Sequence, residues 1–147
     1  MTSVLRISEA ASLALHTAVL LAANRGRVVS TVDIASVLGV SEAHLSKVLQ
    51  RLNHAGLVDS VRGPRGGFVL ARDPEQTSLL AVYEAVAGPL GEAECLLERT
   101  ICGGGSECIL GGLLHSVNQE VKGYLARTKI AQLTRVYKGQ PCLGVER

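Results

Sequence analysis

The chain has 147 residues, 47% of them hydrophobic, which is enough apolar material for one core of ordinary size. Aromatic residues make up only 3% and tryptophan is absent, which argues against a surface that stacks the bases of single-stranded nucleic acid. The formal net charge of +2 is too small to indicate a polyanionic partner by itself. Evidence for such a partner must come from where the charged residues lie in the sequence.

Three helices are predicted in the first part of the chain. Residues 7–24 are predicted to form a helix that is apolar on most of its surface. Its apolar segment, residues 12–23, is interrupted by His16 and is too short to span a bilayer, so we expect a cytoplasmic protein with no membrane partner. Ser30 is the expected N-cap of a second, short helix that ends at Gly39. Ser41 begins a third helix, with apolar residues every three or four positions, that ends near Gly56. The short turn between the last two helices is typical of a helix-turn-helix.

The third helix and the segment after it concentrate the positive charge. Polar and basic side chains lie on the helix surface opposite its leucines, where they can donate hydrogen bonds to phosphates and base edges or form an ordinary solvated face. Two strand-like runs, residues 57–61 and 68–71, flank a Gly/Pro turn that carries Arg62 and Arg65. This hairpin is either a wing beside a DNA duplex or a basic surface turn. Residues 41–72 contain five Lys or Arg and two acidic residues, which favours double-stranded DNA as a partner.

The second half of the chain begins with a helix that ends at Gly88, and a longer helix and a last short helix follow the cysteine-rich loop. The long helix carries one apolar stripe. This stripe either pairs with its symmetry mate in a homodimer or belongs to the core of one chain. Its members are Leu110, Leu114, Val117, Val121 and Leu125.

Three cysteines and three consecutive glycines lie within the fourteen residues from Cys95 to Cys108, with Cys102 between them. In a reducing compartment, clustered cysteines more often serve metal or redox chemistry than disulfides. The spacing is too wide for paired CxxC zinc motifs, whereas thiolates are iron-sulfur ligands and glycines let the backbone approach inorganic sulfide. We therefore predict an iron-sulfur cluster, with 4Fe-4S preferred and 2Fe-2S possible. A structural zinc, or cysteines without metal, are the alternatives.

The segment GVSEAHLSKVLQRLNHAGLVDSVRGPRGGFVLAR, from Gly39 to Arg72, and the cysteine loop together resemble the Rrf2 family of winged helix-turn-helix transcriptional regulators. This resemblance covers nearly the whole chain and extends to the iron-sulfur assembly regulators and nitric-oxide sensors of the family. It implies a homodimer on a partly palindromic operator, with the third helix in the major groove and the hairpin in the adjacent minor groove. The residues that it nominates for DNA contact are Ser41, His44, Ser46, Lys47, Arg51, Arg62 and Arg65.

The resemblance also implies that Cys95, Cys102 and Cys108 are cluster ligands, although the first gap is one residue longer than in many members. The histidine ligand of the assembly regulators would fall on Gly111, and the acidic ligand of the nitric-oxide sensors near Ser12. His16 is similar to a histidine that a redox-sensing member contributes across the dimer, and it is the predicted fourth ligand. The alternatives are Glu9, Ser12, His115 and Cys142.

The fold class predicted from these features is mainly α with a small β-hairpin wing. A winged helix-turn-helix domain, residues 1–75, would precede a cluster-binding loop and dimerisation helix, residues 76–147. The predicted function is DNA-binding transcriptional regulation, with operator affinity controlled by a cluster that senses nitric oxide, redox state or iron. The alternative is a cluster-free regulator switched by a metabolite or by cysteine oxidation. An enzyme is not expected, because no nucleotide-binding loop or nucleophile constellation is found.

Overall fold

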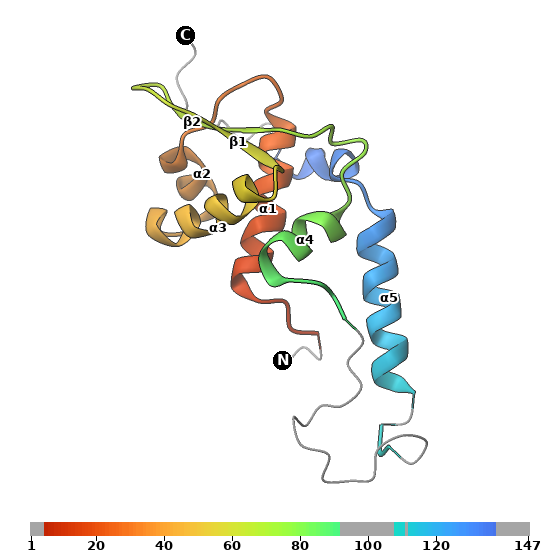
Figure 1. The fold of residues 1–147 in the computed structure, drawn as a ribbon. Coiled ribbons are helices and arrows are strands. Elements are labelled where there is room, and N and C mark those ends of the chain that lie inside the picture. The colour runs from red at the N-terminus through yellow and green to blue at the C-terminus, as the bar shows by residue number, and fades with distance from the viewer. Residues whose placement is uncertain (1–4, 92–107, 111, 138–147) are drawn as a thin grey trace.

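The computed structural model describes residues 5–91, 108–110 and 112–137, and it confirms a mainly helical chain with one small hairpin (Figure 1). Cys95, Cys102, Gly111 and Cys142 lie outside the described residues. No helix in the described part is both long and apolar enough to cross a membrane. The elements, in chain order, are α1 (Glu9–Ala23), α2 (Thr31–Leu38), α3 (Glu42–His54), β1 (Val58–Val61), β2 (Gly67–Leu70), α4 (Leu79–Ala87), α5 (Leu113–Arg127) and the 3-10 helix η2 (Ile130–Tyr137).

Serine side chains begin four of the helices. The hydroxyl of Ser30 accepts a hydrogen bond from the backbone N–H of Asp33, and Ser41 does the same for His44. Ser8 and Ser78 cap α1 and α4 in the same way. Gly39 ends α2 with φ +66°, a left-handed conformation that costs glycine little. The predicted boundaries of the second and third helices are therefore confirmed.

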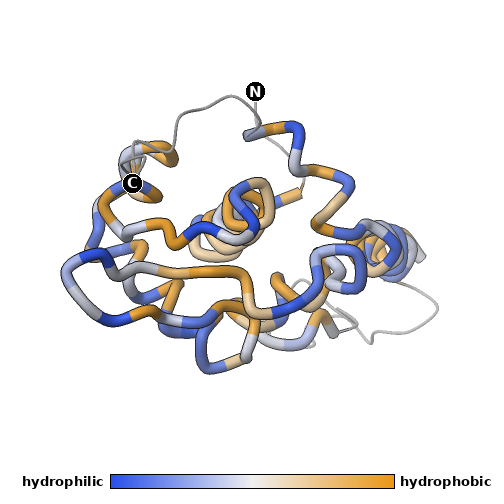
Figure 2. Tube along the Cα trace, turned by 90° about the horizontal axis from the view of Figure 1, so that it is seen from above, coloured by the Kyte–Doolittle hydropathy of each residue, from blue (hydrophilic) through white to orange (hydrophobic). Residues whose placement is uncertain are grey.

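α1 runs through the middle of the molecule, and the other elements surround it (Figures 1 and 2). It packs against α2, α3, β2, α4 and η2. Nine of its fifteen residues are buried, and most of these are Ala, Leu or Val. Because α4 and η2 come from the second half of the chain, the two predicted parts share one core.

The β1–β2 hairpin, called the wing below, is antiparallel and pairs Val58 with Leu70 and Val61 with Gly67. Val29, in the loop before α2, adds a further bridge to Phe68 through two backbone hydrogen bonds of 2.8 and 3.0 Å. The wing is thereby fastened to the helical core. This bridge brings the chain so close that a Cβ at Gly67 would overlap the carbonyl oxygen of Val29.

α5 extends away from the core beside α4, and the predicted apolar stripe divides between two of its faces (Figure 1). Leu125 is buried and Val121 packs against the core, so part of the stripe belongs to the fold of one chain. Val117 is exposed instead. At 3.6 residues per turn, it shares a face with Leu113 and Tyr124, whose exposed fractions are 56% and 50%. The apolar surface open to a partner is this second face, which the stripe prediction missed.

We expect Gly67→Ala to lower the free energy of unfolding by about 1–3 kcal/mol, because the added methyl group overlaps backbone that cannot rotate away. Urea denaturation followed by circular dichroism measures this change. Gly91→Ala is the control, since a Cβ there meets open space and the residue is exposed. Equal stability of the two variants would contradict the close approach at Val29.

Candidate nucleic-acid interface and metal centre

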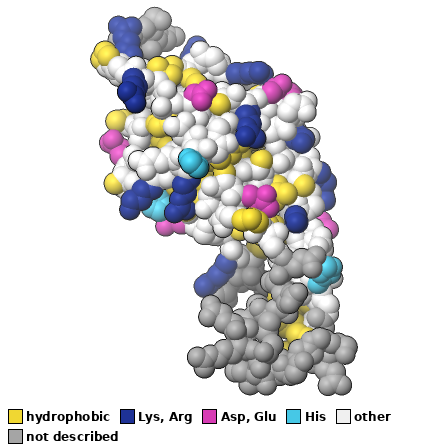
Figure 3. Space-filling model, in the orientation of Figure 1, with side chains coloured by type: hydrophobic (Ala, Val, Ile, Leu, Met, Phe, Trp, Pro, Cys, Tyr) yellow, Lys and Arg dark blue, Asp and Glu magenta, His cyan; other side chains and the backbone are white. Residues whose placement is uncertain are grey.

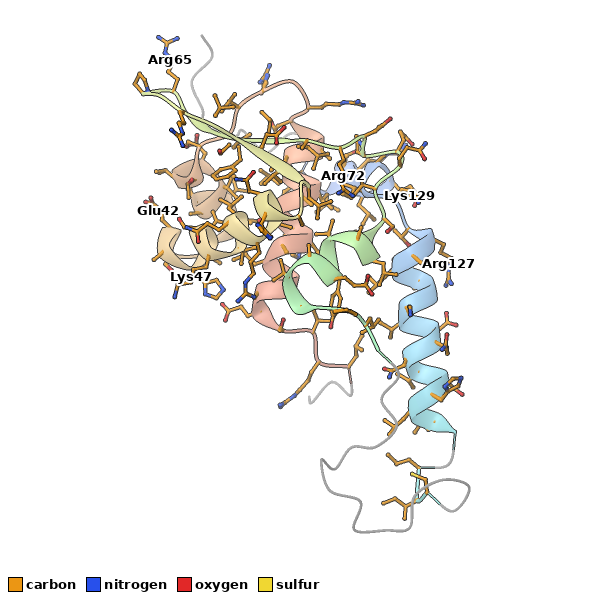
Figure 4. All side chains as sticks on the ribbon, in the orientation of Figure 1. Glu42, Lys47, Arg65, Arg72, Arg127 and Lys129 are labelled. Carbon is orange, nitrogen blue, oxygen red and sulfur yellow. The ribbon has the colours of Figure 1, made fainter. Side chains whose placement is uncertain are left out.

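Basic side chains from α3 and the wing lie on the side of the molecule away from α5. Figure 4 shows Lys47 on α3 and Arg65 at the tip of the wing, and Figure 3 shows Lys and Arg side chains in both places. Lys47, Arg62 and Arg65 are exposed, and no hydrogen bond or ion pair to another described residue holds any of them. These three cations are therefore available to an external anion.

Two other basic residues of the same segment are exposed too, but they hydrogen-bond to the backbone of the protein. The guanidinium of Arg72 donates to the carbonyl oxygens of Gly56 and Ala55, each at 3.0 Å, and so caps the C-terminus of α3. The guanidinium of Arg51 donates to the carbonyl oxygen of Val86 at 3.1 Å, in the last turn of α4. The sequence placed both residues in the basic segment but gave no signal for these partners, which lie 16 to 35 residues away.

The three remaining residues nominated for DNA contact lie in the first turns of α3. Ser41 is exposed and uses its side-chain oxygen as the N-cap, which leaves its hydroxyl hydrogen for a donor role. Ser46 is half-buried. His44 is half-buried too, and its Nε2 atom is buried with no hydrogen-bond partner among the described residues. In this conformation Nε2 of His44 faces the protein.

The end of α4 connects α3 to the cysteine-rich segment. After Arg51 binds the carbonyl of Val86, the chain turns at Gly88, and the backbone N–H of Leu90 donates to the carboxylate of Glu84 at 3.0 Å. This second hydrogen bond fixes the direction in which the chain leaves α4. α3 and α4 also border a pocket of about 400 Å³, with Lys47 among its lining residues.

The predicted metal ligands are only partly within the described residues. Cys108 is half-buried and precedes α5, and His115 lies on the exposed surface of that helix. Among the described residues, no group of three or more His, Cys, Asp or Glu side chains comes close enough to hold a metal ion. Within the described residues, Cys108 is therefore not a member of a complete metal site.

Three candidate ligands on α1 share one pocket. Glu9, Ser12 and His16 follow one another at helical spacing and line a pocket of about 500 Å³. Ile7, Leu13, Val37, Leu38 and Val40 form its apolar walls, and Tyr137 of η2 completes it. A carboxylate, a hydroxyl and an imidazole are thus presented together, and carboxylate and imidazole both suit iron. This donor set fits a non-cysteine ligand to a cluster.

Tyr137 is a member of this pocket that the sequence did not single out. Its hydroxyl oxygen lies 2.6 Å from Nδ1 of His16, and the two rings meet edge to face with centroids 6.1 Å apart. Burial raises the pKa of Tyr137 above its ordinary value, so the phenol keeps its proton at neutral pH. The only sequence signal for this residue is its place at the end of the last predicted helix.

Comparisons with known proteins agree with this architecture. The transcriptional regulator IscR of Serratia proteamaculans is 33% identical over 101 residues, which cover 69% of this chain and 61% of that protein. The chain therefore spans less than two thirds of the length of this relative. A putative regulator of Aquifex aeolicus is 30% identical over 131 residues, covering 88% of this chain and 91% of the other.

Among solved structures, CymR, described as the global cysteine regulator of B. subtilis, superposes with a TM-score of 0.74 at 28% identity. The match covers 90% of this chain and 98% of CymR. Residues 7–136 match the Rrf2 family, which is described as an iron-dependent transcriptional regulator. The chain belongs to the Rrf2 family of transcriptional regulators.

Proposed function

We propose that this protein binds double-stranded DNA and regulates transcription, and that α3 and the wing are its DNA-binding surface. The observation that carries the proposal is that Lys47, Arg62 and Arg65 are exposed on these two elements without partners among the described residues. An α-helix fits the major groove, and arginines at the tip of a hairpin suit the narrow minor groove. Family membership supports the same function.

We propose a homodimer that forms through α5. Leu113, Val117 and Tyr124 lie on one face of a helix that projects from the core, with the Glu120–Arg127 ion pair beside them, and each of the three side chains is more than a third exposed. Large apolar side chains gathered on one exposed face indicate a protein contact. A two-fold partner would present the same face, which is how symmetric dimers bury such a surface.

We propose that Cys95, Cys102 and Cys108 hold an iron-sulfur cluster together with a ligand from the pocket on α1. His16 is the preferred fourth ligand. The resemblance that nominates His16 has this ligand contributed across the dimer, so the pocket would serve the cysteine loop of the partner chain. When bound, the cluster would supply a group that reacts with nitric oxide or oxidants and is lost when iron is scarce.

The residues at the end of α4 offer a route from the cysteine loop to α3. Glu84 holds Leu90, near the start of the loop, and Arg51 ties α3 to the carbonyl of Val86. A change in the position of the loop would therefore change the position of α3 through these two hydrogen bonds. A coupling of about 1–3 kcal/mol, the usual range for allostery, changes affinity about 5- to 150-fold.

A second candidate function is a cluster-free regulator switched by a metabolite or by thiol oxidation. The similarity to CymR, described as the global cysteine regulator of B. subtilis, favours this alternative. The pocket on α1 supports it too, because an apolar cavity with a few convergent polar groups suits a small molecule.

The double variant Lys47→Ala/Arg65→Ala tests the DNA-binding surface. We expect its affinity for an operator selected from random duplexes to fall at least about tenfold, and the salt dependence to weaken by about one counterion for each lost phosphate contact. Fluorescence anisotropy at several salt concentrations measures both. Lys122→Ala, on α5, is the control, and sedimentation checks that both variants keep their oligomeric state. Unchanged affinity of the double variant would refute this surface.

Arg51→Ala tests the route through α4. We expect the ratio of operator affinities with and without cofactor to shrink towards one, because the substitution removes the hydrogen bond to Val86. Titration of operator DNA with both forms of the protein gives this ratio. The control Lys47→Ala should lower both affinities and keep the ratio. If Arg51→Ala also lowers both equally, Arg51 is a DNA contact and not a link.

Purification without oxygen tests the cofactor. We expect brown protein with about four irons and four sulfides per chain, since three thiolates and one further ligand fill the corners of a 4Fe-4S cluster. The ultraviolet-visible spectrum, together with iron, sulfide and zinc analysis, distinguishes an iron-sulfur cluster from zinc and from metal-free protein. Colourless, metal-free protein that still binds DNA would favour the thiol or metabolite switch, and zinc alone would make the loop structural.

A further inference from the structure

We propose that Tyr137 is a positioning residue for His16: its hydroxyl holds Nδ1 of the imidazole, so that Nε2 is the nitrogen offered to a metal. This inference rests on the proposed cluster and adds Tyr137 to the residues that would serve it. The two residues lie 121 positions apart in the chain, and their side chains meet at 2.6 Å.

The contact between His16 and Tyr137 distinguishes the two nitrogens of the imidazole ring. Nδ1 of His16 is engaged by Tyr137, whereas no hydrogen bond to Nε2 is found among the described residues. His16 is exposed and lines the pocket with Glu9 and Ser12, while Tyr137 is only 9% exposed. An exposed histidine side chain is thereby held in one orientation by a hydrogen bond to a buried tyrosine.

The chemistry of metal-bound histidine explains why such an anchor matters. A neutral imidazole that binds metal through Nε2 carries its proton on Nδ1, and that N–H needs an acceptor. The phenol oxygen of Tyr137 can accept it at the observed distance. Ligating histidines almost always donate their other N–H to an oxygen acceptor, usually a carboxylate, a backbone carbonyl or water, and loss of the acceptor typically costs about 10- to 100-fold in metal affinity.

The alternative is that the hydrogen bond between Tyr137 and His16 only stabilises the fold. η2 packs against α1, and the hydrogen bond could simply fasten these two elements. In that case its loss would change stability without changing the environment of the metal. The test therefore needs a signal from the histidine nitrogen itself.

Tyr137→Phe, Tyr83→Phe and His16→Ala are purified without oxygen beside the unsubstituted protein, each labelled with 15N-histidine. Tyr83→Phe is the matched control, because it removes a phenol hydroxyl from α4 that has no hydrogen bond to a described residue. Pulsed electron paramagnetic resonance of the reduced cluster reports the coupling of a bound histidine nitrogen. The half-time of iron loss to a chelator reports retention, and circular dichroism reports folding.

We expect His16→Ala to abolish the nitrogen coupling, and Tyr137→Phe to change it and to speed iron loss about 10-fold or more, with folding unaltered. Tyr83→Phe should match the unsubstituted protein. If Tyr137→Phe changes neither the nitrogen coupling nor the rate of iron loss, whereas His16→Ala changes them, the positioning role is overturned. The proposed cluster with His16 as a ligand is then retained. If His16→Ala keeps the coupling, His16 is not the ligand and the inference fails alone. Absence of any cluster in the unsubstituted protein overturns it together with the proposed cofactor.

Discussion

The burial of α1 is the constraint on which the rest of the structure depends. Most faces of this helix are apolar, so other elements must cover it on several sides, and α2, α3, β2, α4 and η2 do so. The helix-turn-helix and the C-terminal elements consequently pack on one scaffold. The exception is the face that bears Glu9, Ser12 and His16, which borders a pocket. This polar face is the part of α1 that is left open to solvent, and so to a ligand or partner.

This arrangement brings the proposed sensing and DNA-binding residues into one packed body. α3 contacts both α1 and α4, so the pocket on α1 and the chain leaving α4 each lie one element away from the proposed recognition helix. Close-packed interiors transmit small displacements instead of absorbing them. A ligand held between the α1 pocket and the cysteine loop could therefore bias the position of α3 through contacts that already exist.

Local signals in the sequence predicted the elements well because their causes are local. Ser30, Ser41 and Gly39 act on neighbouring backbone groups, so their roles follow from three or four consecutive residues. The partners of Arg51, Arg72 and Tyr137 could not be predicted, because each depends on how distant segments pack. The two faces of α5 were confused for a related reason. Adjacent helix positions differ by about 100°, and only the position of α4 decides which face is buried.

The distribution of basic side chains links the proposed DNA-binding surface to the proposed dimer. Two of the five Lys or Arg residues in the basic segment serve the fold, which leaves Lys47, Arg62 and Arg65 available to a polyanion. Nonspecific affinity for DNA grows with the number of phosphates that a protein neutralises, and three cations neutralise few. A second copy of the chain, as in the proposed dimer, would double that number and join two proposed recognition helices in one particle. If the proposed dimer forms through α5, the exposed apolar side chains of that helix would contribute to DNA binding by bringing two sets of these cations together.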